Sequence, residues 1–278
     1  MLWWNALLLG SLLTTCSSLI ATNCRLREKL NMSTVQVEVT SDFACPWCYV
    51  GKARLDAAVK AFEGPSNPDD TAGRAPKVHV SFSPYMIDTG TQPLGEDYLA
   101  YNERRWGGDG WTASMKRSAS KDGCEFAKWV TWPNSLLAHR LQILAGKAGK
   151  GDQVNSLVFQ TIYERGGNAS DLETLVSLAE EAGLPPADAR AYLHSREGEE
   201  DILKNDRRAK TELNVRGVPY FVVRAAGPGP GGAESASASS AAAGGGGGGK
   251  GRPAEVVLKG AVGTDELMRA FATVSRGV

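Results

Sequence analysis

The chain has 278 residues with 31 basic and 31 acidic side chains, so its formal net charge is zero. Its composition, 42% hydrophobic and 22% charged, is typical of a globular protein that buries a full core. The balanced charge argues against nucleic acid or an anionic membrane surface as a partner, because no overall field would attract either. The five cysteines are too few, and odd in number, for a disulfide framework.

The first 33 residues share only some features of a targeting segment. They are apolar and carry no charge before Arg25, like the centre of a signal peptide, but they lack the basic residues that normally open one. Met32 stands directly before the first strand pattern, so two alternatives stay open. Translation from Met32 would give a cytoplasmic protein, whereas residues 1–30 would otherwise direct the chain to an organelle or the secretory route. We expect residues 1–33 to lie outside the fold.

The first elements follow a strand–helix–strand pattern. Valines alternate with polar residues over 35–40, which predicts a half-buried strand. From Pro46 onward apolar residues recur every three or four positions and predict a helix, and residues 63–76 are rich in Pro, Gly and Asp, as loops are. Alternation resumes within 77–87 and predicts a second strand, which we expect to lie parallel to the first.

Residues 95–213 carry no strand pattern and are predicted to form a series of helices. Asn134 precedes one helical pattern and is a candidate N-cap. Ser170 is a second candidate cap, because Glu173 follows it at the spacing of a capping box. No membrane span is expected within the folded part of the chain.

Strand patterns return at 218–224 and 254–260, and Thr264 is the candidate cap of a last helix. Between the two strands, residues 225–253 form a Gly, Ala and Ser tract without apolar periodicity. Such a tract cannot bury enough surface to offset its ordering entropy, so we expect a disordered loop.

The order of these elements is β–α–β, a helical block, then β–β–α. This order predicts an α/β protein with a thioredoxin-like fold and an inserted all-helical domain. We expect a single domain over 34–278. Its thioredoxin core comprises 34–87 and 214–278, and the helical insert comprises 88–213.

The stretch C-P-W-C, from Cys45 to Cys48, stands where the first strand gives way to a helix. Free N–H groups and the macrodipole at a helix N-terminus stabilise a thiolate, which makes such a cysteine nucleophilic. We therefore expect Cys45 to be the attacking or attacked sulfur and Cys48 to resolve the mixed disulfide. Pro46 suits the first helical turn, and Trp47 is a candidate for a surface that faces the substrate.

Two other interpretations of the cysteines compete with a redox pair. A zinc site would need a second C-x-x-C or a pair of histidines, but His79, His139 and His194 are scattered, so we expect no metal. Two purely structural thiols would not explain why both stand between a strand and a helix. A redox pair is the favoured interpretation.

Pro219 follows Val218 at the start of a predicted strand, where proline would disturb ladder pairing. A cis Val218–Pro219 bond would explain the position, whereas a trans proline at a strand start is the alternative. In thioredoxin-like folds such a cis proline faces the C-x-x-C pair and leaves the preceding backbone free to bind substrate.

Four segments together carry a family resemblance: "SDFACPWCYVGK", "PNSLLAHRLQILA", "LVSLAEEAGL" and "VRGVPYFVV". In these segments the chain resembles the DsbA-like thioredoxin family, and within it the FrnE-like oxidoreductases. That branch is related to 2-hydroxychromene-2-carboxylate isomerases and kappa-class glutathione transferases. The resemblance implies that Cys45 and Cys48 form the redox pair and that Val218 and Pro219 bind substrate. The related branches typically have serine at the position of Cys45, so the cysteine favours dithiol chemistry.

The predicted function is thiol–disulfide exchange with a protein or small-molecule substrate, without a metal or organic cofactor. A glutathione-dependent isomerase or transferase, and a redox-inert binding module, are the alternatives; glutathione could also be a co-substrate. Asn134 and His139 are candidates to line a cleft above Cys45, but we favour the alternative, in which Asn134 caps a helix and His139 forms structural hydrogen bonds. Asp42 could influence the thiols by its charge or act only as a turn residue.

Overall fold

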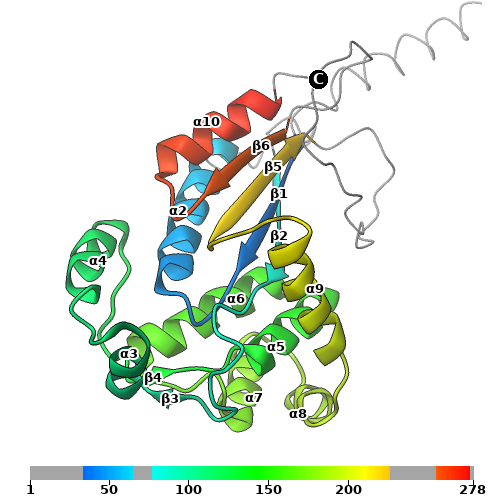
Figure 1. Ribbon diagram of the computed structural model, residues 1–278. Helices are drawn as coiled ribbons and strands as arrows, with labels where there is room; N and C mark the ends of the chain where they lie inside the picture. Colours follow the sequence, from blue (N-terminus) through cyan, green and yellow to red (C-terminus); the bar gives the residue numbers. More distant parts are fainter. Residues whose placement is uncertain (1–33, 65–76, 226–254, 276–278) are drawn as a thin grey trace, which may run out of the picture.

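The computed structural model describes residues 34–64, 77–225 and 255–275 (Figure 1). The predicted N-terminal extension therefore lies outside the described residues, as do Cys16 and Cys24. The predicted loop over 225–253 also lies outside them, apart from Ala225, which ends a strand.

A four-stranded mixed sheet forms the centre of the thioredoxin part. Its strands are β1 (Thr34–Ser41), β2 (Lys77–Pro84), β5 (Tyr220–Ala225) and β6 (Glu255–Lys259). They lie in the order β2–β1–β5–β6, with β1 parallel to β2 and antiparallel to β5, and with β6 antiparallel to β5. The predicted parallel pair and the returning strands are confirmed.

Helices α2 (Pro46–Glu63) and α10 (Thr264–Ser275) cover one face of this sheet (Figure 1). The alternating apolar residues of the strands point toward these helices, and each such side chain gains roughly 1.5–3 kcal/mol from burial. The buried members of this core include Val35, Val37, Val39, Leu55, Ala58, Phe221, Val223, Leu267 and Phe271.

The block between β2 and β5 lies at the end of the sheet where β1 gives way to α2 (Figure 1). Its α-helices are α3 (Tyr98–Trp106), α4 (Thr112–Ala119), α5 (Leu136–Lys147), α6 (Gly151–Gln160), α7 (Leu172–Glu181), α8 (Pro186–His194) and α9 (Glu199–Thr211). A 3-10 turn, η1 (Ser120–Asp122), follows α4, and a π-helical turn, η2 (Thr161–Arg165), follows α6.

The prediction that residues 95–213 lack strands is wrong at two short places. β3 (Glu96–Asp97) and β4 (Thr131–Trp132) pair antiparallel. Two residues are too few to produce an alternating pattern in the sequence, and their pairing depends on segments more than 30 positions apart.

The helix caps also differ from the sequence prediction. Asp171, not Ser170, caps α7, and its carboxylate accepts the Thr174 N–H at 2.8 Å. The Ser170 hydroxyl instead accepts the Asn134 N–H at 2.7 Å, linking α7 to the start of α5. The N-cap residue of α5 is Ser135 and not Asn134 as predicted, although the Asn134 side chain accepts the Leu136 N–H in the first turn. No helix within the described ranges has the length and apolar character needed to cross a membrane.

Candidate functional site

The two cysteines lie at the N-terminal end of α2. Cys45 is the N-cap residue, with an extended backbone, and its carbonyl accepts the Cys48 N–H at 2.9 Å. Pro46 occupies the first helical turn, where a missing N–H costs nothing. Both thiols are free in this structure, and Cys45 is 7% exposed against 2% for Cys48. Cys45 is thus slightly more exposed than Cys48, although both are buried, and it stands at a helix end that favours negative charge.

The segment before β5 meets the first cysteine from the opposite side. The Val218–Pro219 peptide bond is cis, as the sequence suggested. The Val218 carbonyl oxygen lies 3.6 Å from Cys45 Sγ, although 173 positions separate the two residues. The structure therefore brings Cys45, Val218 and Pro219 together.

The environment of Cys48 keeps its sulfur protonated. Burial is the main cause that raises the pKa of the Cys48 thiol well above its usual range, and the adjacent Cys45 adds to the effect. The Asp42 backbone N–H and the Ser41 hydroxyl act in the opposite direction. Both cysteines are therefore buried, Cys45 slightly less than Cys48, and burial keeps the Cys48 thiol protonated.

The loop before Cys45 is held by the buried side chain of Asp42. Its carboxylate accepts the N–H groups of Ala44 at 3.1 Å and Ile87 at 2.7 Å, and its carbonyl accepts the Cys45 N–H at 3.1 Å. Asp42 thus ties the cysteine loop to the chain that follows β2. These hydrogen bonds show that Asp42 fixes the turn before Cys45.

The two cleft candidates are placed differently. His139 Nε2 lies 3.1 Å from the Tyr85 carbonyl and 3.7 Å from Asp42 Oδ1, so this ring contacts the cysteine loop from the side of α5. The Asn134 amide donates to the Thr91 carbonyl at 2.8 Å. Among the described residues, none of the hydrogen bonds of Asn134 reaches the cysteine loop.

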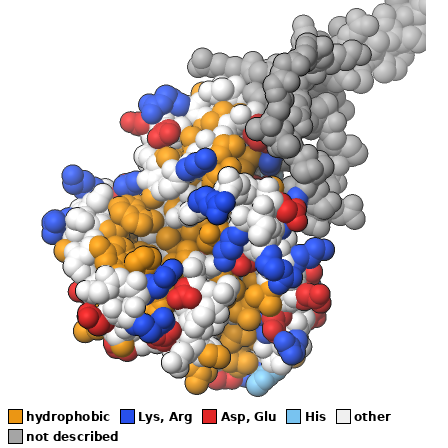
Figure 2. All heavy atoms as spheres, viewed as in Figure 1, with side chains coloured by type: hydrophobic (Ala, Val, Ile, Leu, Met, Phe, Trp, Pro, Cys, Tyr) orange, Lys and Arg blue, Asp and Glu red, His pale blue; other side chains and the backbone are white. Residues whose placement is uncertain are grey.

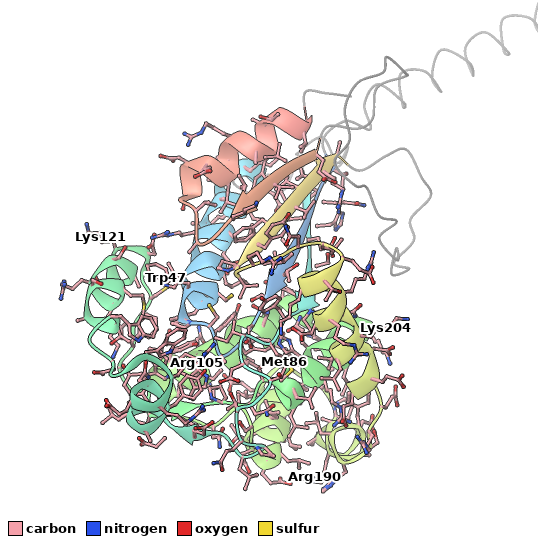
Figure 3. The ribbon with its side chains drawn as sticks, viewed as in Figure 1. Trp47, Met86, Arg105, Lys121, Arg190 and Lys204 are labelled. Carbon is pink, nitrogen blue, oxygen red and sulfur yellow. The ribbon has the colours of Figure 1, made fainter. Side chains whose placement is uncertain are left out.

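Trp47 is half-buried and packs against the large hydrophobic cluster of the helical block. It lies on the side of α2 that faces α4 (Figure 3). Hydrophobic side chains gather on the surface between α4 and the sheet, over the end of α2 that carries the cysteines (Figure 2). This surface could receive an apolar part of a substrate.

Two residues that hold the site in place were missed in the sequence. Gly51 packs against Pro219, and a Cβ atom at position 51 would lie 2.7 Å from the proline Cγ. Tyr163, from the π-helical turn, donates its hydroxyl to the Phe43 carbonyl at 3.1 Å. Only the "YVGK" context of Gly51 could have drawn attention to it, and no sequence signal marks the π-helical turn.

The described ranges contain no group of three or more His, Cys, Asp or Glu side chains placed to hold a metal ion.

Comparison with known proteins gives matches over most of the chain. The family model described as the DSBA-like thioredoxin domain matches residues 36–239. The uncharacterised protein YwbO of Bacillus subtilis is 27% identical over 192 residues, which cover 68% of this chain and 87% of that protein.

Solved structures show the same fold at low identity. A probable DsbA oxidoreductase from Streptomyces coelicolor superposes with a TM-score of 0.63 and 23% identity, over 86% of this chain and 89% of the other. A 2-hydroxychromene-2-carboxylate isomerase superposes with a TM-score of 0.51 and 16% identity, over 87% of this chain and 95% of the other. The family match, which covers well over half of the sequence, establishes that the chain belongs to the DsbA-like thioredoxin domain family.

Proposed function

We propose that the protein is a thiol–disulfide oxidoreductase that works through Cys45 and Cys48, within the FrnE-like branch of its family. One observation carries this proposal above the others. Cys45 Sγ stands at the N-terminus of α2 and 3.6 Å from the Val218 carbonyl, beside the cis Pro219, with the buried Cys48 thiol one helical turn behind it. A substrate disulfide placed between α2 and the Val218 segment would meet the more accessible sulfur first.

In the reducing direction the Cys45 thiolate attacks one sulfur of the substrate disulfide and forms a mixed disulfide. Cys48 then attacks Cys45 Sγ, the substrate leaves as a thiol, and the enzyme becomes oxidised. In the oxidising direction a substrate thiolate attacks the Cys45–Cys48 disulfide at Cys45. The direction follows from the reduction potential of the pair relative to its compartment. The exchange needs no metal or organic cofactor.

Val218 and Trp47 supply the substrate contacts in this proposal. The Val218 backbone would pair with an extended segment of a substrate, and Trp47 would contribute apolar surface. Both protein thiols and small thiols such as glutathione are suited to an exchange of this kind.

The deciding experiment is a redox titration of the purified protein in glutathione buffers, read by mass spectrometry after alkylation. The expected result is a reversible Cys45–Cys48 disulfide with one defined potential, absent in the Cys45→Ser and Cys48→Ser variants. If no intramolecular disulfide forms at any ratio, the proposal is wrong, and the glutathione-dependent activity and the redox-inert module remain.

The Cys48→Ser variant also separates exchange from glutathione-dependent isomerisation or transfer. As an oxidoreductase the variant should accumulate a mixed disulfide at Cys45 and stop turning over. Retained turnover of a glutathione-dependent reaction would favour the second activity, because that chemistry does not need a resolving thiol.

A further inference from the structure

His139 on α5 is a buried ionisable residue that the proposed exchange reaction does not use. It is 5% exposed. Its Nε2 atom lies 3.1 Å from the Tyr85 carbonyl oxygen and 3.7 Å from Asp42 Oδ1. Its ring also packs on Phe43, with ring centroids 5.0 Å apart. These contacts hold the histidine against the loop that carries Cys45 and against the chain that follows β2.

The contacts of the ring favour a positive charge on it. Both neighbours of Nε2 are acceptors, so the neutral ring carries its hydrogen on Nε2 and takes up a second proton at Nδ1. The imidazolium then stands beside the carboxylate of Asp42, which is 1% exposed. A buried charge is stable where an opposite charge faces it, so Asp42 is the partner that a protonated His139 needs.

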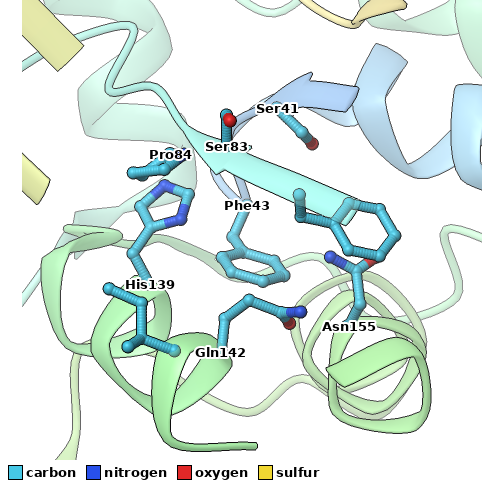
Figure 4. Close-up of a pocket in the computed structure, with 9 residues that line it drawn as sticks. Ser41, Phe43, Ser83, Pro84, His139, Gln142 and Asn155 are labelled. Atoms are coloured by element: carbon cyan, nitrogen blue, oxygen red, sulfur yellow. The ribbon is translucent and has the colours of Figure 1, made fainter. Parts of the chain in front are cut away.

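His139 also lines a small cavity between the ends of β1 and β2 and the helices α5 and α6 (Figure 4). Its volume is about 20 Å³, which is room for one water molecule. Two buried oxygen atoms of residues on its wall, Gln142 Oε1 and Asn155 Oδ1, have no hydrogen-bond partner within the described residues. Amide oxygens carry partial negative charge, so these two residues also favour a protonated ring.

Asp42 connects this histidine to the cysteine pair. The Asp42 carbonyl accepts the Cys45 N–H at 3.1 Å, and its carboxylate accepts the Ala44 N–H at 3.1 Å, so carboxylate and thiol belong to one tight turn. A thiolate at Cys45 forms close to an existing negative charge, which opposes it. A proton on His139 cancels the charge of Asp42 and removes this opposition. The thiolate and the imidazolium therefore favour each other.

We propose that His139 is a positioning residue that, through its pairing with Asp42, takes up a proton when Cys45 forms its thiolate and releases it when the cysteine pair is oxidised. This inference deepens the proposed exchange reaction and rests on it. The linkage is mutual, so the state of Cys45 must change the proton affinity of His139 by the same factor as His139 changes that of Cys45.

The reaction balances in protons and electrons. The reduced protein starts with a Cys45 thiolate, a Cys48 thiol and a protonated His139. Cys45 Sγ bonds to one sulfur of the substrate disulfide, and the first substrate thiolate leaves. Cys48 Sγ then bonds to Cys45 Sγ, and the second substrate thiolate leaves. One thiolate receives the proton of Cys48 and the other, through solvent, that of His139, while two electrons pass from the cysteine pair to the substrate.

Asp42 is the charged group that meets the ring directly. Charged and ionisable side chains on the elements around His139 have partners elsewhere. These pairs are Glu38 with Arg224, Asp152 with Lys52, Asp206 with Lys210, Arg140 with carbonyls at the end of α8, and the Tyr85 phenol with the Val215 carbonyl. The response of His139 to pH should therefore follow Asp42 and the cysteines.

Histidine titration by NMR tests the link without changing His139. The chain has three histidines, and His79 and His194 are exposed, so they serve as internal controls that should not move. The midpoint of the His139 titration should lie about one pH unit or more higher in the reduced protein than in Cys45→Ser, which cannot form the thiolate. The oxidised protein should match Cys45→Ser. Equal midpoints in the reduced protein and in Cys45→Ser would overturn the inference.

Two substitutions should act on Cys45 in opposite directions. His139→Gln keeps an N–H donor for the Tyr85 carbonyl but cannot take up a proton, so the negative charge of Asp42 stays. The pH midpoint of Cys45 alkylation by iodoacetamide should rise by about one unit, which means roughly tenfold slower alkylation below that midpoint. Asp42→Asn removes the opposing charge, so its midpoint should fall.

The matched control is His194→Gln, at an exposed position on α8, which should keep the wild-type midpoint. Urea unfolding shows whether each variant is folded. A purely structural role would disturb the same loop in both site variants. Shifts in the same direction for His139→Gln and Asp42→Asn, or no shift in either, would therefore contradict the inference.

The outcome also separates this inference from the proposed function. Failure to form a reversible Cys45–Cys48 disulfide contradicts the exchange reaction, whereas the His139 titration can still be compared between the reduced protein and Cys45→Ser. A reversible disulfide with the same His139 midpoint in the oxidised and reduced forms leaves the exchange reaction intact and contradicts only the role of His139.

Discussion

Gly51, in the second turn of α2, packs directly against Pro219, the residue that follows the cis peptide bond. A Cβ atom at position 51 would lie 2.7 Å from Pro219 Cγ and 3.4 Å from the Phe221 ring. The missing side chain therefore allows the Val218–Pro219 segment to lie against the helix that carries the cysteines. The approach of the Val218 carbonyl to Cys45 Sγ depends on this contact.

Replacing Gly51 by Ala should therefore disturb the site through the Val218–Pro219 segment. The added methyl group must push Pro219 away, at a cost of about 1–3 kcal/mol, against a gain in helix propensity of up to about 1 kcal/mol. We expect a net loss of unfolding free energy in urea. The glutathione titration should also give a shifted Cys45–Cys48 potential, since the Val218 carbonyl moves.

The control for this variant is Gly146→Ala in α5. No atom lies within 4 Å of a Cβ at Gly146, so only the helix propensity changes. This variant should be slightly more stable than wild type, with the same potential. If Gly51→Ala is as stable as Gly146→Ala, the packing argument is wrong.

Arg140 is buried at 2% exposure and holds the end of α8 in place. Helix C-terminal carbonyls lack intrahelical donors and favour a nearby cation. We expect Arg140→Met to lose roughly 3–5 kcal/mol of stability, because it removes the guanidinium donor of four carbonyls, of which only that of Tyr192 keeps another donor within the described residues, the Ser195 hydroxyl. The guanidinium donates to the carbonyl groups of Tyr192, Leu193, Ser195 and Glu197 at 2.5–3.0 Å.

The comparison variant is Arg190→Met. Arg190 lies at the outer edge of the helical block (Figure 3) and pairs with Glu173 in an exposed salt bridge. Such pairs contribute little, because solvent screens them. Thermal and urea unfolding should show a large effect for Arg140→Met and hardly any for Arg190→Met. Equal effects would contradict the assignment of Arg140 to the end of α8.

The parts of the fold that the sequence predicted are those with local signals. Period-two valines marked β1, and the C-P-W-C motif marked the start of α2, because proline and the apolar periodicity both act within a few residues. The place of Pro219 was predicted for the same reason, since a proline at the start of a strand is visible in a short window.

The residues that the sequence did not reveal depend on contacts between distant segments. The role of Gly51 depends on Pro219, a distant residue that packs against it. Gln142 and Asn155 lie on one wall of a small cavity only because α5 and α6 pack together. Ser170 has the spacing of a capping box, but Asp171 is the residue that caps α7. The Ser170 hydroxyl accepts the Asn134 N–H instead. Propensity and spacing describe single elements, and tertiary packing decides between neighbouring candidates.

Tyr163 should influence the redox pair, although its hydroxyl donates a hydrogen bond to the Phe43 carbonyl and not to a cysteine. It is fully buried, and burial, followed by the nearby Cys45 and Asp42, raises the pKa of its phenol, so it remains a donor. In Tyr163→Phe the Phe43 carbonyl loses this donor, which should cost about 1–3 kcal/mol and loosen the cysteine loop. The measurements are urea unfolding and the glutathione titration, in which the potential should shift.

Tyr101→Phe is the matched control. Tyr101 is also fully buried, stacks on Trp132 with centroids 4.0 Å apart, and donates to Asp88 at 3.0 Å. It should lose a similar amount of stability and leave the potential unchanged. A shift of equal size in both variants would show that the effect of Tyr163 is a general loss of stability.

Cys124, the third cysteine within the described ranges, should make the protein less stable at alkaline pH. Cys124 is 2% exposed, and burial, followed by the charges of Asp122 and Glu164, raises the pKa of its thiol from 9.0 to about 12. Above the unfolded pKa the unfolded chain releases this proton while the folded protein keeps it. Stability is therefore intact below pH 9 and falls as the pH rises toward 12, by up to about 1.4 kcal/mol per pH unit.

Cys124→Ala removes this contribution, so its unfolding free energy should decline less steeply than that of wild type above pH 9. Urea unfolding under reducing conditions at several pH values measures the two slopes. Val154→Ala is the control: Val154 is fully buried but cannot ionise, so its loss of stability should be constant with pH. Wild-type and Cys124→Ala curves that stay parallel would contradict the prediction, because a buried thiol that ionises at its ordinary pKa creates no difference between the folded and unfolded states.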